Sequence, residues 1–185
     1  MKFTRGVRWV SGVVLALVAS SFAAPAQAII AGTNAQLGEL PSVVAIANRN
    51  VYAAEGNLVN AAFCGGVLIG QRLVLTAAHC VVDFNNTTKQ PRVSAPAELV
   101  VGGGVLSLKD MKDTYVASVL RVDTTTEYVT SLITSNGNNS TNDIAVLQID
   151  ATLPGTQPVA LATAAQVAAI ENAPTLLTTA GWGDT

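Results

Sequence analysis

Few side chains of this 185-residue chain are suited to chemistry, and the first is its single histidine, His79. It follows an apolar run, Leu73–Ala78, and directly precedes Cys80. A neutral imidazole can take up a proton near physiological pH and return it, which is what general acid–base catalysis requires. A lone histidine is more often structural than catalytic. The apolar run nevertheless predicts a strand, and a strand end would hold a base in a fixed position.

An imidazole base works best when an acceptor holds its other ring nitrogen, and Asp143 is the candidate. It follows a polar, turn-rich segment, Thr134–Asn142, that we expect to be a surface loop, and it opens the apolar run Ile144–Ile149. A carboxylate directly before a core strand must be exposed, cap a turn or be paired. By spacing alone, a turn cap is as good an interpretation as a pair with His79.

The two cysteines, Cys64 and Cys80, form an even set with a short separation. In an oxidising compartment this favours a single disulfide, the alternative being two buried free thiols. One histidine and two cysteines are too few for a closed zinc site, so we expect no metal. No acidic array with calcium spacing is present, and no organic cofactor is implied.

Residues 1–28 have the pattern of an export signal: a basic start, an apolar run from Trp9 to Ala24, and the exit Ala26-Gln27-Ala28. We expect cleavage after Ala28, so that the mature chain begins at Ile29 and is secreted or periplasmic. The alternative is an N-terminal membrane anchor, for which the apolar run is short.

The composition narrows the classes of function further. Without the three basic residues of the leader, the chain has 7 lysines and arginines against 12 acidic residues, a net charge of −5. A chain with no basic excess is not expected to bind nucleic acid, or a membrane once the leader is removed.

Short runs rich in valine, isoleucine and leucine alternate with turn residues, which predicts an all-β barrel or sandwich. The expected strands are Ser42–Ala47, Val67–Ile69, Leu73–Thr76, Leu99–Val101, Tyr115–Val122, Ile144–Ile149 and Thr175–Ala180. The one helical candidate, Ala164–Ala173, is weakly patterned, and a crossing loop fits it equally well.

Several motifs resemble those of the trypsin-like (chymotrypsin-fold) serine proteases. The histidine signature is CGGVLIGQRLVLTAAHC at Cys64–Cys80, the aspartate motif is NDIAVLQI at Asn142–Ile149, and AGWGDT at Ala180–Thr185 is similar to the opening of the second barrel. Ile29–Gly32 resembles the family's mature N-terminus, with Ala31 where the first of two glycines is usual. The motifs occur in family order and cover the mature chain.

The resemblance implies a fold and a role for each matched residue. Residues 29–158 would form the first antiparallel Greek-key barrel, complete, and residues 159–185 the crossing segment and an only begun second barrel. His79 would be the general base and acid, Asp143 would orient it, and Cys64–Cys80 would be the bridge beside it. The substrate would be a protein or peptide, and the protein is expected to be a monomer.

The sequence departs from the family in one respect. The nucleophilic serine belongs to a Gly-Asp-Ser-Gly-Gly motif, and none occurs before Thr185; Ser140 lacks the flanking glycines. We therefore expect a secreted serine endopeptidase whose sequence is cut before the catalytic serine, so that this chain alone is inactive. The alternatives are a non-catalytic secreted binding module on the first barrel, or a partner chain that supplies the second barrel.

Overall fold

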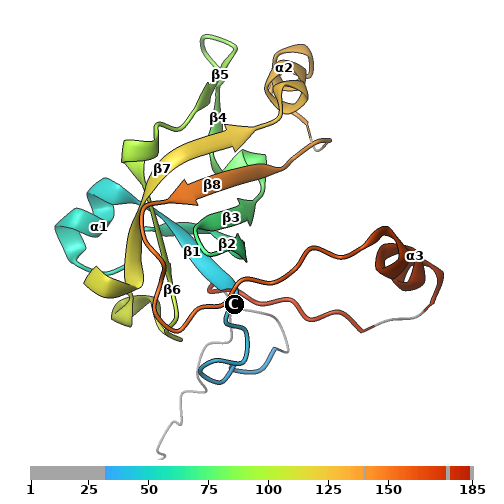
Figure 1. Cartoon of the computed structure of the whole chain (residues 1–185). Coiled ribbons are helices and arrows are strands. Elements are labelled where there is room, and N and C mark those ends of the chain that lie inside the picture. Colours follow the sequence, from blue (N-terminus) through green and yellow to red (C-terminus); the bar gives the residue numbers. More distant parts are fainter. Residues whose placement is uncertain (1–31, 140, 174–175, 184–185) are drawn as a thin grey trace, which may run out of the picture.

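The structure of the chain is a computed structural model that describes residues 32–139, 141–173, 176–183. Eight strands and three α-helices lie within these residues (Figure 1). The strands are β1 Val43–Asn48, β2 Ala62–Gly70, β3 Leu73–Thr76, β4 Val82–Asn85, β5 Gln90–Val93, β6 Leu99–Gly103, β7 Val116–Thr124 and β8 Ala145–Ile149. The helices are α1 Arg49–Glu55, α2 Thr126–Thr134 and α3 Ala164–Asn172.

Six strands close into an antiparallel barrel in the order β1-β2-β3-β8-β7-β6, and β6 pairs with β1 to complete the circle. The order is not sequential, because β3 pairs with β8 across a long excursion of the chain, as in a Greek key. This confirms an all-β fold with a closed barrel. Six of the expected strands are present within a few residues of their predicted bounds.

Strand β1 is buried on both of its faces. Val44 and Ile46 belong to the main core cluster together with residues of the other barrel strands, such as Leu147. Ala45 and Ala47 point the other way, into a second cluster that contains Leu58 and Met111. Successive side chains of a strand point to opposite faces, so β1 has to be apolar throughout.

The strand pair that leads to the histidine packs closely at Gly66. A Cβ atom built on this residue of β2 would lie 2.7 Å from Val74 Cγ1 and 3.1 Å from the carbonyl oxygen of Leu75, both on β3. A side chain at position 66 would therefore push β2 and β3 apart. The glycine allows the two strands to approach just before the site described below.

Four elements were not expected from the sequence. Helix α1 begins after the N-cap Asn48, and helix α2 covers Thr126–Thr134, whose last residue was expected to begin the polar loop. Tyr128 and Leu132 of α2 are buried in the main core cluster. Strands β4 and β5 form a separate two-stranded sheet, whose turn lies at the top of Figure 1 beside α2.

The segment after β8 leaves the barrel. Among the described residues from 150 onward there is one helix, α3, and no strand, so the predicted strand at Thr175–Ala180 is wrong. Figure 1 shows α3 at the end of an arm that projects from the barrel. Leu176 and Leu177 are exposed, as expected, but they lie on irregular chain rather than on an edge strand. No helix in the described part of the chain is long and apolar enough to cross a membrane.

Candidate active site

The histidine lies on a single tight turn at the end of β3. The short 3₁₀ helix η1, Ala78–Cys80, follows Thr76 after one residue, and Ala78 is fully buried within it. The small side chain of Ala78 anchors the turn in the core, while His79 points outward with 63% of its side chain exposed. His79 is therefore fixed at its backbone and open at its ring.

The aspartate, which is distant from the histidine in the sequence, lies at the same end of the barrel. Asp143 comes two residues before β8, and β8 pairs with β3 in a register that sets Ala145 opposite Thr76. Because both chain segments leave the barrel at the same end of this strand pair, residues 64 positions apart become neighbours.

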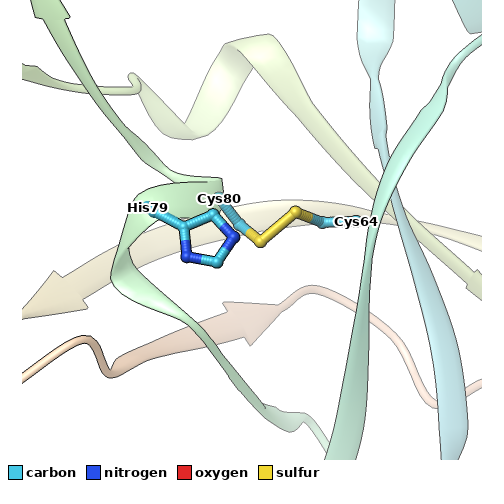
Figure 2. Close-up of side chains that lie close together, drawn as sticks. All are labelled: Cys64, His79 and Cys80. Carbon is cyan, nitrogen blue, oxygen red and sulfur yellow. A yellow bond between two sulfur atoms is a disulfide. The ribbon is translucent and has the colours of Figure 1, made fainter. Parts of the chain in front are cut away.

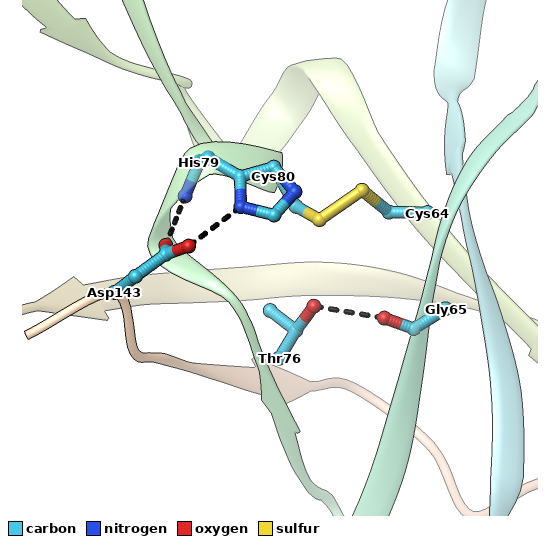
Figure 3. Close-up of a disulfide and its surroundings, with 6 residues drawn as sticks. All are labelled: Cys64, Gly65, Thr76, His79, Cys80 and Asp143. Atoms are coloured by element: carbon cyan, nitrogen blue, oxygen red, sulfur yellow. Dashed lines mark hydrogen bonds and ion pairs between the residues drawn. A yellow bond between two sulfur atoms is a disulfide. The ribbon is translucent and has the colours of Figure 1, made fainter. Parts of the chain in front are cut away.

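His79 and Asp143 form a two-point contact (Figure 3). The backbone N–H of His79 donates to Asp143 Oδ1 at 2.8 Å, and His79 Nδ1 lies 2.7 Å from Asp143 Oδ2. The side chain of Asp143 is 24% exposed, far less than that of His79. Of the two interpretations of Asp143, the structure shows the pair with His79, because both carboxylate oxygens contact that residue.

These contacts set the charge of the carboxyl group. Partial burial alone would raise the pKa of Asp143, but hydrogen bonds from the ring and backbone of His79, and from the backbone of Ala78, hold it below its ordinary value. An ionised carboxylate only accepts hydrogen bonds, so the proton of the contact must belong to Nδ1. The other ring nitrogen, Nε2, then carries a lone pair that can accept a proton.

The predicted disulfide joins Cys64 of β2 to Cys80 (Figure 2), and the described part of the chain has no free cysteine. Cys64, His79 and Cys80 bring their ligand atoms within 4.8 Å of one another, a spacing that would suit a metal ion. Both sulfurs are bonded to each other in the disulfide, however, and a metal requires cysteine ligands that are free thiolates. This cluster therefore does not form a metal site.

An open hollow of about 480 Å³ borders His79 and the disulfide. Phe63, 50% exposed, lines it together with a charged group in which Arg92 bonds both Glu98 and Asp83. A larger hollow of about 970 Å³ lies between residues 32–43 and 177–183 and includes neither His79 nor Asp143. The space beside His79 is thus lined by charged groups and open to solvent.

One predicted site residue lies outside the described structure, and one residue of the site was not predicted. Ile29, the expected mature N-terminus, lies outside the described residues. Thr76 was not singled out beforehand, although the structure places its hydroxyl 2.8 Å from the carbonyl oxygen of Gly65, beside the disulfide (Figure 3). The available signal was its place as the one polar residue in the apolar run before His79.

Comparison with known proteins agrees with this arrangement. Residues 29–185 match the family model described as Trypsin. Serine protease SP24D of Anopheles gambiae is 32% identical over 158 residues, covering 84% of this chain and 46% of that protein. Trypsin, alkaline B, of Manduca sexta is 29% identical over 182 residues, covering 92% of this chain and 59% of that protein.

A solved structure, that of the VesB protease of Vibrio cholerae, is 27% identical, with a TM-score of 0.47 over 66% of this chain and 31% of that one. The chain spans about half the length of the first two curated relatives. Because the family match covers the chain from residue 29 to residue 185, this protein belongs to the trypsin family of serine proteases.

Proposed function

We propose that the protein is a secreted endopeptidase in which His79 and Asp143 are the base and its orienting carboxylate. The observation that carries the proposal is the 2.7 Å contact between His79 Nδ1 and Asp143 Oδ2 on a ring that is otherwise exposed. A buried histidine with both nitrogens occupied would have no free lone pair. Here the carboxylate holds one nitrogen and leaves the other to solvent and substrate.

The chemistry follows from this tautomer. Nε2 accepts the proton of a serine hydroxyl as the oxygen attacks the peptide carbonyl, and Asp143 stabilises the imidazolium that forms. The same proton then passes from Nε2 to the leaving amine. The second hydrogen bond, from the His79 backbone, keeps the carboxylate in place while the ring changes charge.

The nucleophile is expected outside residues 1–185. These residues contain no Gly-Asp-Ser-Gly-Gly motif, and the matches cover only 46% and 59% of the first two relatives. We propose that residues 29–158 form the first barrel domain and residues 159–185 the crossing to a second barrel that brings the serine, oxyanion donors and specificity pocket. The 185-residue chain alone would then have no covalent route to hydrolysis.

The proposed site of action is extracytoplasmic. The leader pattern of residues 1–28 and the family membership both support export, and the disulfide fits an oxidising compartment. The substrates would be proteins or peptides, cleaved by a monomeric enzyme.

Peptide hydrolysis by the protein encoded by the whole gene tests the proposal. We expect that protein to cleave a denatured protein substrate, and His79→Ala to reduce kcat by at least about 10³-fold while the barrel stays folded. Asp150→Asn is the control variant, because Asp150, like Asp143, accepts a hydrogen bond from a backbone N–H. Its donor is Ser118, at the end of β8 away from the site. Equal activity of wild type and His79→Ala would refute the role of His79.

A further inference from the structure

Among the described residues, Thr76 has the one buried side chain that does not belong to the hydrophobic core set, with 8% of the residue exposed. Its hydroxyl donates to the carbonyl oxygen of Gly65 at 2.8 Å (Figure 3). A hydroxyl in a core costs free energy unless it is bonded, and a valine would fill the same space without that requirement. The position of this hydrogen bond indicates what it contributes.

The hydrogen bond lies where the main-chain pairing of β2 and β3 stops. The pairing of β2 with β3 runs from Gly70 opposite Leu73 to Val67 opposite Leu75, and it does not extend to Thr76. On its other side, Thr76 is paired with Ala145 of β8. The side chain of Thr76 therefore connects β3 to β2 one residue beyond the end of their ladder.

Two links attach the histidine segment to consecutive residues of β2. Thr76 bonds Gly65 at one end of the segment, and Cys80 is joined to Cys64 at the other. His79 lies between them, so its short piece of chain is held at both ends against one point of the barrel wall.

We propose that Thr76 is a positioning residue for His79. Its hydroxyl fixes the start of the histidine segment, and this link is sufficient to orient the backbone and ring of His79 toward Asp143; the disulfide separately ties the end of the segment to β2. Because Thr76 is also in register with Ala145, two residues after Asp143, it aligns both members of the pair. The importance of this role rests on the proposed function, but the positioning itself is measurable without activity.

Nuclear magnetic resonance of residues 29–185 provides the test, since the single histidine gives one set of ring signals. The first readout is hydrogen exchange of the His79 amide, which bonds Asp143, measured against the Leu147 amide in the barrel. The second is the signal of the proton on Nδ1. Thr76→Val keeps the shape of the side chain and removes the hydroxyl.

We expect Thr76→Val to speed exchange of the His79 amide about five- to tenfold relative to Leu147 and to broaden the Nδ1 proton signal. Thr76→Ser, which keeps the hydroxyl, should behave as wild type. Thr156→Val is the matched control, because Thr156 also donates to a carbonyl, that of Leu153, away from the site. If Thr76→Val and Thr156→Val affect the His79 readouts equally, Thr76 is merely structural and the inference is wrong.

Reduction of the disulfide tests the same inference without relying on a core variant. A dithiol reductant breaks the Sγ–Sγ bond to two thiols and is itself oxidised to a cyclic disulfide. With the Thr76 link intact, the reduced wild type should keep its Nδ1 proton signal and a protected His79 amide. Loss of both on reduction, while Leu147 stays protected, would overturn the inference even if Thr76→Val fails to fold.

The two proposals can fail separately. Absence of hydrolysis by the whole protein, with the His79 readouts as expected, refutes the proposed function and leaves the positioning role. Hydrolysis that persists while Thr76→Val leaves the readouts unchanged refutes the positioning role alone.

Discussion

Asp143 holds His79 by both its main chain and its ring: one carboxylate oxygen accepts from the backbone N–H at 2.8 Å, and the other lies 2.7 Å from Nδ1. The two contacts fix the rotation of the imidazole as well as its position. They also determine which ring nitrogen carries the proton, and so which nitrogen can act as a base.

Replacing the carboxylate by an amide should reverse this assignment. In Asp143→Asn the Oδ1 atom can still accept from the His79 backbone, but the amide nitrogen then donates to Nδ1. The ring proton moves to Nε2, which can no longer accept one. We expect kcat of the whole protease to fall by about 10⁴-fold with little change in KM. A loss below tenfold would show that Asp143 does not set the tautomer; Asp150→Asn serves as the control.

The carboxylate also makes stability depend on pH. Because the pKa of Asp143 is lower in the folded chain than its ordinary value, the unfolded chain binds the proton more readily in that interval. The contribution of Asp143 is fully present above about pH 4 and is lost as the pH falls below it through the folded pKa. Urea unfolding between pH 7 and pH 2.5 should show wild type losing more free energy of unfolding than Asp143→Asn. Parallel curves for the two proteins would contradict the lowered pKa.

The barrel strands were predictable because both the turn residues and the apolar runs mark them. β3 and β8 are short, nearly uninterrupted apolar runs in which every second side chain is buried. The contact between His79 and Asp143 was not predictable from spacing, since it depends on the pairing of β3 with β8, in which Thr76 lies opposite Ala145. Family resemblance supplied it.

The elements that were missed or wrongly predicted from the sequence have specific physical causes. Strand β5 contains Pro91, which has no backbone N–H to donate and therefore argues against a strand in the sequence. The strand pairs with β4 alone, in a two-stranded sheet. Helix α2 is rich in β-branched residues, which weaken its propensity, but Thr125 caps its start and Tyr128 and Leu132 bury one face. The apolar run near Leu176 forms no strand because the described structure offers it no partner to pair with.

The disulfide should be complete and stabilising in the secreted chain. Thiol labelling under denaturing, non-reducing conditions is expected to find no free thiol at Cys64 or Cys80. Removing the bridge in Cys64→Ala/Cys80→Ala should lower the free energy of unfolding by about 3 kcal/mol, because the unfolded chain regains the freedom of the loop. Two labelled cysteines per wild-type molecule would exclude the bridge.

Export should generate the mature N-terminus in a single cut. Ala26-Gln27-Ala28 is a signal-peptidase pattern directly before Ile29, so N-terminal sequencing of secreted protein should begin Ile-Ile-Ala-Gly. A start at Gln27 would mean that cleavage follows Ala26 and that trimming is needed. A start well upstream would mean that residues 1–28 include an anchor or a propeptide.

Labelling with a serine-directed fluorophosphonate tests most directly whether His79 and Asp143 serve a serine that lies outside residues 1–185. The secreted protein from the whole gene, its His79→Ala variant and the 185-residue chain would be treated in parallel. We predict labelling of the whole protein, its near-complete loss in His79→Ala, and none of the 185-residue chain. Labelling of the 185-residue chain that His79→Ala abolishes would contradict this, because the nucleophile would then lie within it.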